Sequence, residues 1–294
     1  MIDFLKYRTV CLTFSLAILG GFLGMAVYRY QTRGSVFILS VDFTGGTQVL
    51  LNFENPVDSA AVKAAVSDAG WKGAAARYFS KHDVVVRVAD FSSDVQGVAT
   101  RILDVVRTAF PENKVTIKQT EHVGAGVGQE LWLWSLISIL IALGAMLSYI
   151  AIRFFSFSYA LGAVVALFHD ALVMLGVFLL FDREISVNVI GAILAIMGYS
   201  INDTIVIFSR IRDRMRTSNS ARIGDVVNHS INHTLKRTIL TSISTGLPVG
   251  AMFILGGEAL RDFSIALMVG IIFGTYSSIY IASPIMMLFH NNKN

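Results

Sequence analysis

Six long hydrophobic runs, separated by polar segments, dominate the pattern of the chain. They are Thr9–Tyr28, Leu131–Ile152, Tyr159–Phe181, Ile185–Phe208, Ile239–Leu255 and Phe263–Phe289. Their lengths match the roughly 20 residues that a helix needs to cross the hydrocarbon core of a bilayer. The pattern therefore predicts a polytopic α-helical membrane protein with six transmembrane helices.

The segment between the first two runs has a different pattern. Residues 29–130 hold eleven Lys/Arg and eleven Asp/Glu, so the segment is neutral and well solvated. Its periodicity predicts four strands, Thr47–Phe53, Ala74–Phe79, Val84–Ala89 and Val115–Glu121, and two helices, Asp58–Ala69 and Ser93–Phe110. The order β-α-β-β-α-β is typical of a ferredoxin-like fold. We expect a small α+β domain over 29–130, between a first part at 1–28 and a second membrane part at 131–294.

Basic residues fall mostly on one side of the predicted membrane. Eleven are on the side of the two termini, and only Arg183 and Arg261 lie in the short loops opposite. The positive-inside rule then predicts cytoplasmic termini, a cytoplasmic loop at 210–236 and a domain at 29–130 on the outer side of the membrane. We interpret the run Arg210–Arg216 as a topology signal that contacts lipid headgroups, not as a nucleic-acid site.

Composition and motifs narrow the possible chemistry. The chain is 54% hydrophobic and 15% charged, whereas soluble domains are about 25% charged. Walker A, nucleophile-elbow and HExxH motifs are absent, and His229 and His233 lack a third metal ligand in the sequence. We therefore expect neither an enzyme nor a metal or organic cofactor, and any energy source is an ion gradient or a partner.

The fourth run contains one formal charge, Asp203. A carboxylate in hydrocarbon costs about 2.5–3.5 kcal/mol on insertion scales, so it usually faces protein and has a function. A helical projection places it on a small, polar face that we expect to pack closely against neighbouring helices; the face also contains Asn188, Gly191, Ala192, Ala195, Gly198, Tyr199 and Asn202. The alternative is an aspartate that only reaches the headgroups.

Other polar residues at membrane depth extend this candidate pathway. His169 and Asp170 lie in the middle of the third run, and such a pair is typical of proton relays or of a neutral pair that fixes packing. Arg237 begins the fifth helix and either turns inward toward Asp203 or anchors the helix at the membrane surface. Small residues also recur every four positions in the sixth run, at Ala266, Gly270, Gly274, Ser278 and Ala282, which predicts close helix packing within the chain or with a partner.

Five motifs together resemble the SecF family. They are VDFTGGT at 41–47, VGAGVGQEL at 123–131, FHD at 168–170, GYSINDTIVIFSRIRD at 198–213 and NHTLKRTILTS at 232–242. The resemblance covers nearly the whole chain, although the segment 29–130 is matched more weakly. SecF proteins are six-helix subunits of the SecDF auxiliary complex of the bacterial Sec translocase, in the resistance-nodulation-division superfamily.

This resemblance implies a function and its residues. It implies a subunit that works with SecD and the SecYEG translocon, including accessory membrane proteins, and uses the proton motive force to promote export of unfolded polypeptide. The coupling ion is then H⁺, and the proton path includes Asp203 and Arg237, with His169, Asp170 and Asn202 as further candidates. Six helices are half of a superfamily core, and SecD would supply the other half. Two alternatives stay open: a half-size exporter of small molecules or lipids, and a passive assembly factor.

Overall fold

The structure is a computed structural model that describes residues 1–92, 94–124, 126–217 and 222–290. It divides into two compact units, which we describe separately. Unit 1 comprises Met1–Ile38 and Ile137–Asn294, and unit 2 comprises Leu39–Leu136. The boundaries differ from the expected 29–130 because the first helix continues to Arg33 and the strands begin later.

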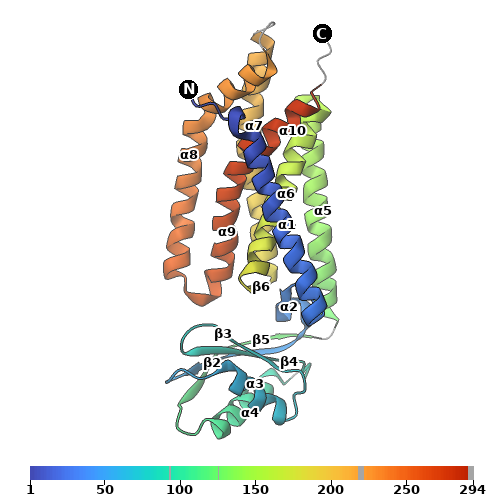
Figure 1. Cartoon of the computed structure of the whole chain (residues 1–294). Coiled ribbons are helices and arrows are strands. Elements are labelled where there is room, and N and C mark those ends of the chain that lie inside the picture. Colours follow the sequence, from blue (N-terminus) through green and yellow to red (C-terminus); the bar gives the residue numbers. More distant parts are fainter. Residues whose placement is uncertain (93, 125, 218–221, 291–294) are drawn as a thin grey trace. The chain divides into compact units, whose positions relative to one another are not determined.

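Unit 1 is a helix bundle (Figure 1). Among the described residues, six helical segments are long and apolar enough to cross a membrane. Their elements, after a short 3₁₀ turn η1 (Leu5–Tyr7), are α1 (Arg8–Arg33), α5 (Val127–Phe154), α6 (Phe157–Leu180), α7 (Val187–Thr217), α8 (Ile223–Leu255), and α9 (Gly257–Ser277) continued by η2 (Ser278–Ala282) and α10 (Ser283–Leu288). Short β1 (Ile38–Leu39) and β6 (Glu184–Ile185) flank the helices.

Three of these helices form the centre of unit 1. In α6, α7 and α9, half or more of the most apolar window is buried inside the chain. In α1, α5 and α8 the buried share is only 6–11%. Because an apolar helix face must be covered by lipid or by protein, these three helices present most of their surface to the membrane or to a partner.

The segment 210–236 was expected as a polar, partly helical loop. Its helical part is larger than expected, because α7 continues to Thr217 and α8 already begins at Ile223. Only residues 218–221 of that segment lie outside the described part. The sequence is polar there but contains no proline and few glycines, so charged residues continue the helices beyond their apolar portions.

Ion pairs fix the turns at the opposite end of the bundle from the two termini. Asp182, after α6, accepts from Arg29 and from Arg33 of α1, the latter at 2.9 Å. Burial alone would raise the pKa of Asp182, but the two arginines outweigh it and hold this pKa below its usual value. Arg183 pairs with Asp262 of α9. The arginine expected in this short loop is therefore neutralised locally.

Unit 2 is a four-stranded antiparallel sheet with two main helices. Its strands are β2 (Gly46–Phe53), β3 (Ala75–Tyr78), β4 (Asp83–Val88) and β5 (Val115–Val123), in the spatial order β3-β4-β2-β5. Helix α3 (Ser59–Asp68) follows β2 and α4 (Val95–Ala109) follows β4, so the chain order is β-α-β-β-α-β. Each predicted element is present within a few residues; Ser93, the expected start of the second helix, lies outside the described residues.

Alternating side chains build the core of unit 2. Val49, Leu51 and Phe53 of β2 are fully buried, and they pack with Val62 of α3 and Ile102 of α4. Asp58 caps α3 by accepting from the Ala60 amide at 3.0 Å, as its position predicts.

One buried carboxylate, Asp83 of β4, contacts side chains of β2 and β5. Asp83 accepts from Lys118 at 2.8 Å, from Asn52 at 2.7 Å and from Ser80 at 2.8 Å. Burial alone would raise the pKa of Asp83, but Lys118 and the two hydrogen bonds hold it below the usual value.

The two glycine-rich motifs meet in unit 2. The segment VDFTGGT forms a short helix α2 (Val41–Thr44), which the sequence pattern did not reveal, and then enters β2. A Cβ on Gly46 would lie 2.4 Å from the Val88 carbonyl, and one on Gly128 would lie 2.6 Å from the Phe43 carbonyl. These glycines therefore allow backbone-to-backbone packing.

Candidate functional site

Asp203 lies in the middle of α7 and is 3% exposed. Its Oδ2 has no hydrogen-bond partner among the described residues. A buried carboxylate with one unsatisfied oxygen is poised to accept a proton or a new partner, because leaving it charged and unpaired is costly.

Arg237 does not turn fully inward. Its side chain is exposed, and these two described residues form no ion pair within 4.0 Å. Thr241 lies one helical turn further along α8, and its hydroxyl donates to the Arg237 carbonyl at 3.0 Å. The arginine therefore remains open to a partner or to water.

The packing of α7 differs from the prediction along most of its small, polar face, although Ala192 and Asp203 on that face are buried. Its apolar face is the one buried in the bundle, including Val189, Ile193 and Met197. Gly191 and Gly198 are exposed, and a Cβ on either would meet nothing within 4 Å. The physical reason is that the long apolar side chains of α7 interlock with α6 and α9, which leaves the small, polar face uncovered beside Asp203.

Asn202 belongs to that uncovered face. It is exposed, unlike Asp203 beside it. The structure therefore places Asn202 next to the candidate pathway but outside the bundle interior.

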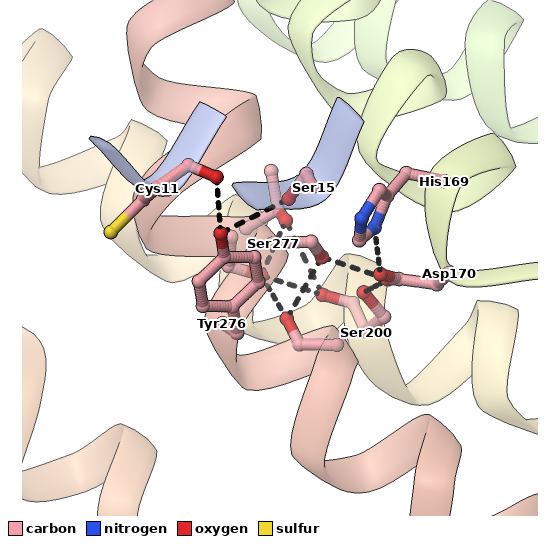
Figure 2. Close-up of polar contacts among 10 residues, drawn as sticks. Cys11, Ser15, His169, Asp170, Ser200, Tyr276 and Ser277 are labelled. Carbon is pink, nitrogen blue, oxygen red and sulfur yellow. Dashed lines mark hydrogen bonds and ion pairs between the residues drawn. The ribbon is translucent and has the colours of Figure 1, made fainter. Parts of the chain in front are cut away.

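Asp170 forms a second polar centre between α6, α7 and α9 (Figure 2). It is fully buried, and its Oδ2 accepts from Ser200 at 2.7 Å and from Ser277 at 2.8 Å. The Nδ1 atom of His169 lies 3.2 Å from Oδ1. Three partners satisfy this carboxylate, and the network links three helices. These contacts favour a structural function for Asp170, whereas Asp203 has an oxygen without a partner among the described residues.

Tyrosine and serine side chains surround this second centre. The Tyr276 ring lies 6.3 Å from the His169 ring, and the Tyr276 hydroxyl donates to the Cys11 carbonyl at 2.7 Å and contacts Ser15 at 3.0 Å (Figure 2). These contacts attach α1 to α9. The Nε2 atom of His169 is buried without a hydrogen-bond partner among the described residues.

The regular ladder of small residues packs inside the chain. A Cβ on Gly270 would lie 2.5 Å from the Ile196 side chain, and one on Gly274 would lie 3.0 Å from Ser200. Ser278 bonds with Thr204 of α7 at 2.8 Å and begins the π-helical segment η2. The ladder therefore holds α9 against α7 within this chain and does not face a partner. The surface of α7 that is open to a partner is the opposite one, which contains Gly191 and Gly198.

Several residues that form hydrogen bonds between the helices were not identified from the sequence. Ser200 and Ser277 hold Asp170, Thr204 holds Ser278, and a further bond joins Tyr199 to Ser242 at 3.1 Å. Serine and threonine residues are common in helix interfaces, so type alone did not single them out. The feature that could have identified them is their position in the hydrophobic runs, at the same depth as the His169–Asp170 pair. Among the described residues, no three His, Cys, Asp or Glu side chains gather as a metal site.

Comparisons with known proteins agree with these motifs. The family described as "Protein export membrane protein SecD/SecF, C-terminal" matches residues 103–292, and "SecD/SecF GG Motif" matches residues 36–57. "Protein translocase subunit SecF" of Rhodothermus marinus is 40% identical over 97% of this chain and 92% of its own length. The protein of the same name from Pseudomonas aeruginosa is 38% identical over 97% of this chain and 90% of its own length.

Solved structures agree as well. A crystal structure of SecDF from Thermus thermophilus, titled a translocon-associated membrane protein, has a TM-score of 0.86 at 33% identity. SecDF in a super-membrane-facing form gives a TM-score of 0.70 at 32% identity. Both cover 99% of this chain, which spans only 39% of either SecDF chain. The chain is a polytopic helical membrane protein, and it belongs to the SecF family of protein translocase subunits.

Proposed function

We propose that this chain pairs with SecD and uses the proton motive force to promote export of unfolded polypeptide through the Sec translocon. One observation carries the proposal: Asp203 is buried with an unsatisfied oxygen, and Gly191, Gly198 and Asn202 on the same small, polar face of α7 are exposed in the described part of the chain. A partner helix on that face would complete the surroundings of the carboxylate. Protonation of Asp203 would then change the contact between the two halves.

The proposed partner is supported by chain length in the relatives. SecDF of Thermus thermophilus joins both halves in one chain. This chain aligns with 35% of the length of that protein, at 36% sequence identity. A separate SecD would therefore supply the rest of the superfamily core. The exposed glycines Gly191 and Gly198 permit close approach of such a helix, as small residues do at membrane helix interfaces.

The proposed topology places both termini in the cytoplasm and unit 2 in the periplasm, across the bacterial inner membrane. Its support is the asymmetry of eleven basic residues against two. The sheet order β3-β4-β2-β5 and the chain order of its elements support a ferredoxin-like fold for unit 2. Reporter fusions at Asn294 and near Gln96 should be labelled from opposite sides. Labelling from one side would contradict the six-span arrangement.

The periplasmic unit is proposed to contact the emerging polypeptide without catalysing a reaction. Tyr78 is exposed at the end of an edge strand, β3 of the sheet, where an extended chain can pair with unpaired backbone groups. Cross-links from a photoreactive group at Tyr78 to a secreted chain in transit would support this contact.

The test of the proposed function is a transport assay. Inner-membrane vesicles that contain SecYEG and SecD, with or without this chain, should export a secreted protein at different rates only when a proton gradient is present. A half-size exporter would instead move a small molecule without SecD. A passive assembly factor would raise export equally with and without an uncoupler. Either result would replace the proposal.

A further inference from the structure

Two arginines converge where α5 turns into α6. Arg153 is at the end of α5, and its guanidinium lies 5.6 Å from the ring of Phe154. Arg212, from the far end of α7, lies 5.0 Å from the same ring and donates to the Arg153 carbonyl at 3.0 Å. Phe154 is itself buried and stacks on Tyr159 at 5.1 Å. A rigid aromatic pair therefore holds two positive charges near each other.

These charges are not neutralised within the chain. Among the described residues, neither Arg153, Arg210 nor Arg212 has a carboxylate within 4.0 Å, in contrast to Arg183 at the opposite end of the bundle. A guanidinium has five N–H donors, and Arg212 uses one of them. The Nε–H groups of Arg210 and Arg212 are buried without an acceptor in the described part of the chain. The cluster therefore lacks an anion that could accept several hydrogen bonds.

Apolar side chains accompany these charges. Phe155 and Phe157 occupy the same turn and are 89% and 69% exposed. Phe155 also has a φ of 50°, a left-handed conformation that is uncommon for a bulky residue. Aromatic residues at the ends of membrane helices contact the boundary between headgroups and acyl chains. The turn thus places donors for an anion beside a surface for hydrocarbon.

We propose that Arg153 and Arg212 form a binding site for the phosphodiester of an anionic phospholipid, whose acyl chains lie on Phe155 and Phe157. The planar fork of arginine binds phosphate oxygens in pairs, and the aromatic stack restricts both guanidiniums before the lipid arrives. The exposed phenylalanines favour a lipid over a free phosphate or an acidic polypeptide. The site is independent of SecD and of proton coupling, and it needs only a chain that crosses the bilayer.

The test is native mass spectrometry of the full chain with added phosphatidylglycerol, and with phosphatidylcholine of the same acyl chains. The Arg153→Gln/Arg212→Gln variant should bind phosphatidylglycerol roughly 30-fold more weakly, on the basis of the usual contribution of each basic residue to anionic lipid binding. The matched control, Arg222→Gln/Lys236→Gln, removes the same charge from exposed positions and should bind as the wild type does. Arg153→Lys/Arg212→Lys keeps the charge without the fork and should give an intermediate affinity.

Several results would overturn the site. Equal loss in the control pair would mean that only the overall charge matters. Unchanged binding in the glutamine pair, or equal binding of phosphatidylcholine, would exclude an anionic site at these arginines. Competition by inorganic phosphate at the concentration of the lipid would assign the site to small anions. Retention of an acidic polypeptide that blocks the lipid would assign it to a protein. If the Arg153→Gln/Arg212→Gln variant does not fold, the lipid affinity of the Arg153→Lys/Arg212→Lys variant tests the site, and wild-type affinity in that variant would contradict it.

Discussion

Substitutions at two glycines, one in α9 and one in α7, can test the folding of this chain and its assembly with SecD independently. Gly270 of α9 faces α7, and an added Cβ would lie 2.5 Å from Ile196. Gly191 of α7 faces away from the bundle, with nothing within 4 Å of its Cβ position. We predict that Gly270→Ala destabilises the isolated chain and that Gly191→Ala does not.

The magnitude follows from the geometry. Contacts under 3.0 Å force neighbouring atoms to move, and overpacking of this kind costs about 1–3 kcal/mol. Replacing glycine in a helix regains up to about 1 kcal/mol in each variant. Gly270→Ala should therefore lose about 0–3 kcal/mol net, and Gly191→Ala should gain up to about 1 kcal/mol. A difference of about 2 kcal/mol between them corresponds to roughly 4–8 °C in Tm for a bundle of this size.

The assay is thermal unfolding of both variants in the same detergent, followed by co-purification with SecD. The larger variant Gly191→Leu should unfold as the wild type does but should retain much less SecD, because the leucine would block close approach of the partner helix. Equal Tm values for the two alanine variants would refute the packing of α9 on α7. Full retention of SecD by Gly191→Leu would refute the proposed interface.

Three further predictions test individual contacts. Asp83→Ala should destabilise unit 2 by about 1–3 kcal/mol near neutral pH, measured by hydrogen exchange of the strands in the full chain. Because the pKa of folded Asp83 is lowered, its contribution is present above about pH 4, and the difference from the wild type should shrink as the pH falls through the folded pKa. Asp170→Leu should lower the Tm of the bundle by more than Asp203→Leu does, since it leaves two buried hydroxyls without their acceptor. Tyr199→Phe should cost about 0.5–1.5 kcal/mol in thermal unfolding, since it removes only one hydrogen bond, to Ser242.

The sequence predicted the elements well and one helix orientation badly. Runs of apolar residues and the alternation in unit 2 are local signals, so the spans and strands were recognised within a few residues. Which face of α7 is buried depends on the neighbouring helices, which are distant in sequence, and not on a local signal. A small, polar face is typical of a helix interface in a membrane, but the sequence does not say whether the interface lies within one chain or between two.

The candidate site was predicted in part for the same reason. Asp203 and Asp170 were evident because a charge in a hydrophobic run is rare. Their different surroundings were not evident, because Ser200 and Ser277 reach Asp170 from two other helices that are distant in sequence. Arg237 was expected either to turn inward or to anchor the helix, and its exposed position depends on how α8 packs, which local pattern does not determine.

The most direct test of the account is export from vesicles that contain SecYEG, SecD and the Asp203→Asn variant, with and without an uncoupler. One charge crossing the membrane potential supplies about 2.3 kcal/mol per 100 mV, enough to bias a two-state motion. Asp213→Asn is the matched control, since it makes the same change on the exposed surface of α7. We predict that Asp203→Asn assembles normally but loses the gradient-dependent part of export, and that Asp213→Asn keeps it. Export by Asp203→Asn at the wild-type rate, with the same response to the uncoupler, would contradict proton coupling through this residue.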